Sequence, residues 1–381
     1  MSTTGVSIGK QYGLKRDNFI LDPIADTDCF ARDDIRTSDV AESLDVDLVT
    51  GLAPKRLVWG PYGGGKTHTL MRTMKELAQL TPIEYRRIEC PDLSKKSRFH
   101  DLYREGIMRS LGQDFVLKLV EDAVHSVGPA RRDELLERLK AKFGDEEIAK
   151  AAIRVVDPNF NMLRLWAWIS GVPMARQELA DLGQTQDLTE TEAARLADII
   201  WLLGRLLREL RSKTLVLILD EMERLRSIGP ETIPTFESGF TRLVDPNQKM
   251  VSILIGSSAA IQSEMVDIFR EEGPVASRLG KDAQIEITSL STPDVNRFIE
   301  GVIAYLRDPG SNLAELISSS SKSSNGENVS TPYFPFTDEA VEAIKSQIPT
   351  MTPRAITLKM TRSLGRAFRG NHSVITSAVV S

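Results

Sequence analysis

The stretch that decides the fold is Leu57-Val58-Trp59-Gly60-Pro61-Tyr62-Gly63-Gly64-Gly65-Lys66-Thr67-His68. A short apolar run leads into a glycine-rich turn, and apolar side chains then recur at helical spacing, at Leu70, Met74 and Leu77. This pattern predicts a strand, a loop and a helix in that order. The turn matches G-x-x-x-x-G-K-[ST] without a gap, in the structural context that the motif requires.

The glycine-rich turn has the composition of a phosphate-binding loop. Its glycines let consecutive backbone N–H groups point at phosphate oxygens, and the following helix adds the positive end of its dipole. We expect Lys66 to reach the β- and γ-phosphates of ATP and the Thr67 hydroxyl to coordinate Mg²⁺. The residues expected to bind ATP are Gly60, Pro61, Tyr62, Gly63, Gly64, Gly65, Lys66, Thr67 and His68. The alternative is an ordinary glycine-rich turn.

A second motif lies where an apolar run ends in two carboxylates. Residues 215–219 read LVLIL, and Asp220 and Glu221 follow directly. Such a strand is typical of a parallel sheet covered on both faces, and its carboxyl end lies where ligands bind in open α/β folds. We expect Asp220 to hold Mg²⁺ and Glu221 to act as the general base that polarises the attacking water. A core strand that merely ends in acidic residues is the alternative.

Three further polar positions follow later in the chain. Ser257 and Ser258 come after an apolar run, where a hydroxyl is placed to orient the attacking water; a helix cap or turn serine is the alternative. Arg278 suits a role in a neighbouring subunit's site, because arginine stays charged and binds phosphate bidentately. Arg354 follows Pro353, which favours the first turn of a helix. For both arginines a surface salt bridge is the alternative.

Apolar runs and helical periodicity alternate along the chain. Short strands are expected at residues 57–59, 83–90, 214–219, 250–255 and 283–287. Residues 94–213 read mostly as amphipathic helix, and further helices are expected after Asp33 and from Thr337 to the end. This alternation predicts an α/β fold with a parallel sheet and helices on both faces.

The motifs occur in an order that resembles the AAA+ ATPases of the initiator and transposon-regulator type, over residues 50–375. This resemblance implies a P-loop αβα sandwich followed by a helical lid. It implies that Ser257 or Ser258 is sensor 1. It also implies that Arg278 is the arginine finger and that Arg354 is sensor 2. A homo-oligomer is the expected partner arrangement.

The resemblance suggests three domains. Residues 1–50 would be an N-terminal arm, and residues 51–290 an AAA+ nucleotide-binding domain. Within the latter, the helical stretch 94–213 would be a large insertion, well beyond a minimal core. Residues 291–381 would be the helical lid, with a flexible serine-rich loop at 308–333.

A narrower resemblance concerns segments outside the phosphate loop. Residues 163–171 (LRLWAWISG), the long helix that runs into residues 220–225 (DEMERL), and residues 334–340 (FPFTDEA) look similar to ATP-binding proteins of BREX-type phage-defence islands. This resemblance implies a role in antiviral defence or mobile-element control, with other proteins of such systems as partners.

The C-terminal segment is basic. Residues 342–381 carry six basic side chains and one acidic one. Arg362, Arg366 and Arg369 are spaced to share one helical face, which could follow the backbone of double-stranded DNA. A solvated charged face is the alternative.

Composition argues against several other classes of protein. The net charge of −5 gives no global case for nucleic-acid binding, and two distant cysteines and four scattered histidines make a disulfide scaffold or structural zinc improbable. The N-terminus has no apolar signal region, and no apolar run approaches the roughly 20 residues that span a membrane. A cytoplasmic protein without a membrane partner is therefore expected.

Taken together, the sequence predicts an AAA+ ATPase that binds and hydrolyses ATP-Mg²⁺ to switch an oligomeric assembly in DNA-related processes. A signalling NTPase or scaffold that uses ATP as a structural switch is a second possibility. A P-loop phosphotransferase is a third, but the Asp220–Glu221 pair favours water as the acceptor.

Overall fold

The structure is a computed structural model that describes residues 7–29, 42, 44–48, 50, 52–189, 191–270, 272–320, 324 and 326–381. The helix expected after Asp33 lies partly outside these residues, and the described residues 42 and 44–48 are helical. The chain divides into two compact units. The sheet unit comprises Glu42–Trp59 and Met74–Glu286, and the loop–lid unit comprises Met1–Ala41, Gly60–Thr73 and Ile287–Ser381.

The centre of the sheet unit is a five-stranded sheet in the order β2-β3-β4-β1-β5. The strands are β1 (Lys55–Gly60), β2 (Ile83–Glu89), β3 (Thr214–Asp220), β4 (Val251–Ser258) and β5 (Gln284–Glu286). The pairs β2–β3, β3–β4 and β1–β5 are parallel, and every residue of β3 is buried. A strand that is covered on both faces needs a continuous apolar sequence, and for this reason the apolar run at residues 215–219 predicted a strand. The predicted α/β fold with a parallel sheet is confirmed.

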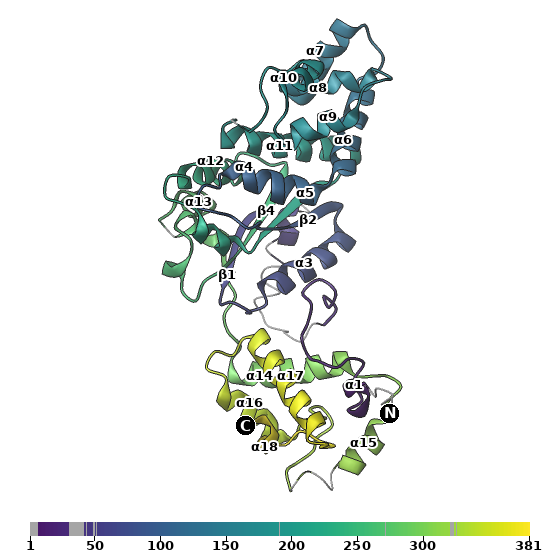
Figure 1. Cartoon of the computed structure of the whole chain (residues 1–381), viewed down its shortest axis with the longest axis vertical. Coiled ribbons are helices and arrows are strands. Elements are labelled where there is room, and N and C mark those ends of the chain that lie inside the picture. The colour runs from purple at the N-terminus through teal and green to yellow at the C-terminus, as the bar shows by residue number, and fades with distance from the viewer. Residues whose placement is uncertain are drawn as a thin grey trace. The chain divides into compact units, whose positions relative to one another are not determined.

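Helices account for the residues between β2 and β3, as the sequence predicted (Figure 1). They are α4 (Phe99–Asp101), the π-helix η1 (Leu102–Met108), α5 (Arg109–Leu111), α6 (Gln113–Ser126), α7 (Arg132–Phe143), α8 (Glu146–Ala152), the 3₁₀-helix η2 (Ile153–Val156), α9 (Met162–Ile169), α10 (Arg176–Leu182) and α11 (Ala193–Arg211). The 3₁₀-helix η3 (Met222–Ser227) and α12 (Ile233–Leu243) follow β3, and α13 (Pro274–Leu279) precedes β5.

Helix α11 packs directly on the sheet through Gly204. A Cβ atom on Gly204 would lie 2.3 Å from Cγ2 of Val251 in β4 and 2.7 Å from the carbonyl oxygen of Met250. Real carbon atoms do not approach so closely, so only glycine fits between this helix and this strand. The same core contains Phe99, whose ring meets Phe240 edge to face at 5.8 Å between centroids. The insertion and the sheet therefore share one hydrophobic core.

The regular secondary structure described in the loop–lid unit is mainly helical. Helix α3 (Lys66–Leu80) begins in this unit and continues into the sheet unit. The unit also contains α1 (Ile8–Gln11), α14 (Thr292–Leu306), α15 (Leu313–Ser320), α16 (Asp338–Gln347), α17 (Pro353–Arg369) and α18 (Ser377–Val380). Residues from both ends of the chain meet in its core, where the rings of Phe19 and Phe336 lie 5.6 Å apart. Figure 1 shows α1 with the C-terminal helices.

The serine-rich segment is not loop throughout, so this part of the prediction was wrong. Helix α15 occupies Leu313–Ser320 within the expected loop at 308–333. Its apolar residues Leu313, Leu316 and Ile317 recur at i, i+3 and i+4, a short helical pattern that the neighbouring serines obscured.

The N-terminal segment belongs to the same unit as the lid helices. The Lys15 N–H donates to the carbonyl oxygen of Leu306 at 2.9 Å, and the Tyr12 hydroxyl donates to that of His372 at 2.6 Å. Residues 7–29 are thus tied to the lid core. The C-terminal part of this unit begins at Ile287, four residues before the lid start expected at residue 291. Among the described residues, no helix is long and apolar enough to cross a membrane.

Candidate nucleotide-binding site

The predicted phosphate loop joins the end of β1 to the start of α3. Lys66 and Thr67 form the first residues of α3, so their backbone N–H groups lie at the positive end of the helix. The Gly64 N–H donates to the Pro61 carbonyl at 3.0 Å, which closes a tight turn inside the loop. This local structure is the one that the motif predicted.

Lys66 is folded back onto the loop that precedes it. Its Nζ donates to the carbonyl oxygens of Gly60 at 3.1 Å and Pro61 at 3.0 Å, and the side chain is buried. A buried ammonium group must be matched by acceptors, and phosphate oxygens are stronger acceptors than backbone carbonyls. The position therefore suits a lysine that exchanges carbonyl partners for phosphate.

Arg354, at the start of α17, lies against the phosphate loop. Its backbone N–H donates to the Gly63 carbonyl at 3.2 Å, and its guanidinium carbon lies 5.0 Å from the centre of the Tyr62 ring. Gly63 has a φ of 74°, and a Cβ atom there would lie 2.6 Å from Cβ of Arg354. Gly63 is thus required both by its backbone conformation and by this close approach. Arg354, which is far from the loop in sequence, is thus in direct contact with it.

His68 turns toward the N-terminal segment. Its Nε2 donates to the Asp26 carbonyl at 3.1 Å, and burial lowers the pKa of the ring. Asp26 in turn accepts two hydrogen bonds from Arg16, at 2.6 and 3.0 Å, and one from the Tyr305 hydroxyl at 3.1 Å. These contacts connect the first turn of α3 to α14 through residue Asp26. Sequence reasoning missed this link, because no local pattern marks contacts between residues so far apart.

In the sheet unit, Asp220 ends β3 in a buried, charged environment. Its side chain is buried, and its Oδ2 accepts a hydrogen bond from Nε of Arg87, on β2, at 2.8 Å. The Glu221 N–H donates to the Asp220 Oδ1 at 3.0 Å. These two hydrogen bonds fix the orientation of the Asp220 carboxylate at the end of the strand. Arg87 was not anticipated from the sequence, since its role depends on the pairing of β2 with β3.

Glu221 follows in an unusual backbone conformation. Its φ of 57° and ψ of 35° lie in the left-handed region, which costs a residue with a side chain about 1 kcal/mol or more. Its carboxylate forms an ion pair with Arg224, which also donates to the Cys90 carbonyl at 2.7 Å and to Glu89 at 2.9 Å. Burial raises the pKa of Glu221, and the negative charges of Glu89 and Asp220 add to this effect, while Arg224 opposes it. A raised pKa suits a proton acceptor.

The two serines at the end of β4 differ in their surroundings. Ser257 is completely buried, and within the described part of the chain its Oγ has no hydrogen-bond partner. The Ser258 backbone N–H donates to Glu223 at 2.9 Å. An unpaired buried hydroxyl costs about 1–3 kcal/mol, so Ser257 is the better candidate for a group that needs a ligand or water.

Arg278 and its rival Arg270 are both exposed. Nη1 of Arg278, on α13, donates to the Thr241 carbonyl at 3.0 Å. Arg270 forms an ion pair with Asp267 at 2.8 Å, so its charge is matched within its own chain. Across the described residues Arg278 has no acidic partner, and its charge remains available to a neighbouring molecule.

The basic face of α17 is present as a surface. Arg362, Arg366 and Arg369 are exposed, whereas Leu364 and Ala367 on the opposite side are buried. In the described structure none of the three arginines forms an ion pair. The pKa of Lys359 is lowered by burial and then by the charges of Arg366 and Arg362, which shows that positive charge is concentrated here.

Oxygen donors are available for Mg²⁺. The described residues contain no group of three or more His, Cys, Asp or Glu side chains that could hold a metal ion. Mg²⁺ prefers oxygen ligands and is commonly bound by one or two protein side chains together with substrate phosphates. The Thr67 hydroxyl and the Asp220 carboxylate fit that chemistry.

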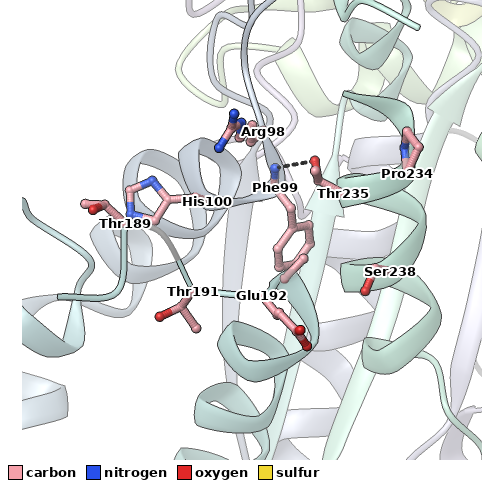
Figure 2. Close-up of a pocket in the computed structure, with 10 residues that line it drawn as sticks. Arg98, Phe99, His100, Thr189, Thr191, Glu192, Pro234, Thr235 and Ser238 are labelled. Carbon is pink, nitrogen blue, oxygen red and sulfur yellow. Dashed lines mark hydrogen bonds between the residues drawn. The ribbon is translucent and has the colours of Figure 1, made fainter. Parts of the chain in front are cut away.

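A separate pocket of about 290 Å³ opens between the starts of α4, α11 and α12 (Figure 2). The hydroxyl of Thr235 accepts from the Phe99 N–H at 3.2 Å and donates to the Thr232 carbonyl at 2.8 Å. The Thr189 hydroxyl is likewise bound to Asp187. The Thr235 hydroxyl thus links the starts of α4 and α12, and none of the residues expected to bind ATP lines the pocket, so it is not our candidate for the nucleotide.

The parallel sheet, the glycine-rich loop after β1 and the flanking helices define an α/β P-loop fold. No family model and no curated protein matches the chain. Solved structures similar to it include Drosophila ORC bound to DNA (TM-score 0.46, 12% identity, 100% of this chain and 67% of that one). A second is Cdc6p from Pyrobaculum aerophilum (TM-score 0.40, 13% identity, 90% of this chain and 64% of that one). A third is a Walker-type ATPase of Pyrococcus abyssi (TM-score 0.41, 13% identity, 90% of this chain and 69% of that one). The chain thus spans about two thirds of these longer proteins.

Proposed function

We propose that this chain is an AAA+ ATPase that binds ATP-Mg²⁺ and hydrolyses it to switch an oligomeric assembly. The main support is the position of two strand ends in one sheet. β1, which leads into the phosphate loop, and β3, which ends in Asp220 and Glu221, are separated only by β4. Their parallel direction directs both carboxyl ends to the edge where α/β folds bind ligands.

In this proposal each side chain has a defined task. Lys66 neutralises the β- and γ-phosphates, and Thr67 and Asp220 hold Mg²⁺, which neutralises charge on the transferring phosphoryl group. Glu221 accepts a proton from a water molecule, and the oxygen of that water attacks the γ-phosphorus. The bond between the γ-phosphorus and the β–γ bridging oxygen breaks, which releases ADP and phosphate. Ser257 orients the water, and Arg354 stabilises the γ-phosphate of its own subunit.

An assembly is part of the proposal because, among the described residues, one carbonyl contact is the interaction found for the exposed Arg278 side chain. An exposed arginine can enter a neighbour's site and stabilise the charge of the transition state. The experiment that tests the function is to measure ATP turnover and particle size together, with and without double-stranded DNA. Turnover that requires assembly supports the proposal, and hydrolysis by a stable monomer contradicts it.

A DNA-related process is the proposed setting, supported by the three exposed arginines on α17, which form no ion pair among the described residues. Phage defence or mobile-element control is the narrower proposal, supported by the resemblance at residues 163–171. A host that expresses the chain with its neighbouring genes should resist phage infection, and Lys66→Ala should abolish the resistance. Equal plaque numbers with both forms would contradict the defence role without affecting the ATPase proposal.

One observation favours a slower, switch-like protein as the second candidate. The ion pair between Arg224 and Glu221 occupies the carboxylate that must contact water. A signalling NTPase would retain this pair with ATP bound and would release product very slowly. Single-turnover kinetics distinguish the two, because DNA-stimulated multiple turnover is expected only of the first.

A further inference from the structure

The π-helix η1 places two arginines side by side on the surface of the insertion. The Arg109 N–H donates to the Arg104 carbonyl, five residues earlier, which is the hydrogen bond of a π turn. In an α-helix, side chains five residues apart point about 140° away from each other. The π turn instead stacks Arg104 and Arg109 on one face, and both line a hollow of about 450 Å³.

The opposite wall of this hollow comes from residues 163–171, the segment to which the nucleotide chemistry assigns no role. Trp166 and Ser170 line the hollow from this side, and Val172 lies at its edge. Val172 is 39% exposed, and Leu163, one helical turn before Trp166, is 54% exposed. An indole flanked by exposed aliphatic side chains and arginines is typical of the centre of a protein interface.

The two walls are fixed to each other. Oη of Tyr103, in η1, donates to the Ile169 carbonyl at 2.6 Å, and Nε2 of His100 donates to the Gly171 carbonyl at 2.8 Å. The face of η1 that carries Leu102, Ile107 and Met108 is buried in the core. The hollow therefore exists before any partner binds, which lowers the entropic cost of binding.

The charges of the hollow indicate what it binds. Arg104 forms an ion pair with Glu105 at 2.9 Å, while Arg109 forms none within the described residues, so one positive charge is in excess. Basic and acidic residues nearly balance over the whole insertion, which does not favour a long nucleic acid. One excess cation beside a partly buried tryptophan matches a short segment with a carboxylate and a large apolar side chain.

We propose that this hollow, formed by Arg104, Arg109, Trp166 and Val172, docks an acidic peptide segment of a partner protein. An apolar side chain of the segment packs on Trp166 and Val172. A carboxylate of the same segment binds Arg109 bidentately. Docking involves none of the residues assigned to ATP, so this inference does not rest on the proposed ATPase activity.

The test is selection of a phage-displayed library of random 12-residue peptides on the full chain. We expect the selected sequences to combine Asp or Glu with Leu, Phe or Trp. Fluorescence anisotropy of a labelled selected peptide should show that Arg109→Glu and Trp166→Ser weaken binding about tenfold or more. Arg176→Glu is the matched control, because Arg176 is an exposed arginine of the same insertion outside the hollow, and it should change binding less than about twofold.

Thermal unfolding and ATP turnover of each variant distinguish a lost interface from a lost fold. Failure to select any peptide, or selected peptides without acidic residues, overturns the proposal. So does peptide binding that persists in the folded Arg109→Glu variant. An oligonucleotide of twelve thymidines that binds in its place, with the same sensitivity to Arg109→Glu, would assign the hollow to nucleic acid instead.

Discussion

The guanidinium of Arg354 stacks on the ring of Tyr62, with 5.0 Å between the guanidinium carbon and the ring centre. Both residues flank Gly63, whose carbonyl accepts the Arg354 N–H. The arginine that the sequence assigned to nucleotide sensing is therefore held on the phosphate loop by an aromatic side chain of that loop. Binding of a γ-phosphate must compete with this stack for the guanidinium.

The first prediction concerns this pair. Arg354→Ala should weaken ATP binding about tenfold, the effect of removing one charge-assisted hydrogen bond. Tyr62→Ala should strengthen it by up to about fivefold, because an exposed cation–π contact of about 0.5–1 kcal/mol no longer competes. Tyr62→Phe keeps the ring and serves as the control. Titration with a fluorescent ATP analogue measures all three, and unchanged affinity in Arg354→Ala contradicts the role.

The second prediction concerns Lys66. Lys66→Ala should reduce ATP affinity by at least about tenfold, because the phosphates lose a charge-assisted hydrogen-bond donor worth about 1.5–3 kcal/mol. The hydrogen bonds of Lys66 to Gly60 and Pro61 stay within the loop, so the thermal unfolding temperature should change little. Calorimetric titration with ATP provides the measurement. Wild-type affinity in a folded Lys66→Ala protein would remove the basis of the nucleotide site.

The third prediction concerns Glu221 and Arg224. Glu221→Gln should bind ATP normally but lose turnover by roughly 10²-fold or more, the effect of removing a positioned base. It should accumulate as an ATP-bound assembly, visible by size-exclusion chromatography. Near-normal hydrolysis would show that Glu221 only ends a strand.

The same pair predicts a pH dependence. Glu221 accepts a proton only when it is ionised, and burial raises its pKa, so turnover should fall with decreasing pH at values above the usual glutamate pKa of about 4.3. Arg224→Gln removes the charge that lowers this pKa, so the acid limb should move to still higher pH. A limb that moves to lower pH, or stays in place, contradicts the assignment.

The fourth prediction tests Arg278 as a residue that acts in trans. Arg278→Ala should keep ATP affinity but lose hydrolysis, and other P-loop systems lose about 10³- to 10⁵-fold. Mixing it with Lys66→Ala protein should restore part of the activity, because the intact Arg278 can reach a neighbouring intact site. Arg270→Ala is the matched control, since the Asp267 ion pair already occupies that arginine. Wild-type turnover of Arg278→Ala without complementation would favour the signalling-switch alternative.

The fifth prediction concerns the arginines on α17. Changing Arg362, Arg366 and Arg369 to Glu should weaken binding to double-stranded DNA and make it less dependent on salt. The slope of log affinity against log salt should fall by about one for each phosphate that is no longer neutralised. Changing Arg131, Arg132 and Arg138 to Glu is a charge-matched control elsewhere on the chain. If the parent chain shows no affinity for DNA at low salt, this face is only solvated.

Local patterns were sufficient for much of the fold. β3, β4 and the phosphate loop could be predicted because contiguous apolar runs and a glycine motif mark them directly. Helix α15 was missed because serines diluted its short apolar pattern. The π-helix left no signal in the sequence, since a shift from i→i+4 to i→i+5 hydrogen bonding needs no particular composition.

In the candidate site, too, some contacts follow from local sequence spacing and others depend on the tertiary fold. Arg224 stands three residues after Glu221, so their ion pair was within reach of a helical spacing argument. The pairing of Arg87 with Asp220 and of His68 with Asp26 depends on tertiary contacts that no local pattern encodes. Sequence motifs thus identify the groups that do chemistry, but not the side chains that hold those groups.

The absence of a side chain at Gly204 has a consequence for signalling. At Gly204 the backbone of α11 lies directly against the Val251 side chain of β4, and such close packing transmits a displacement of the helix to the strand. β4 ends at Ser258, directly after Ser257, whose hydroxyl has no hydrogen-bond partner among the described residues. A protein bound to the insertion could therefore alter the rate of ATP hydrolysis from a distance, through mechanical transmission along a rigid helix and strand.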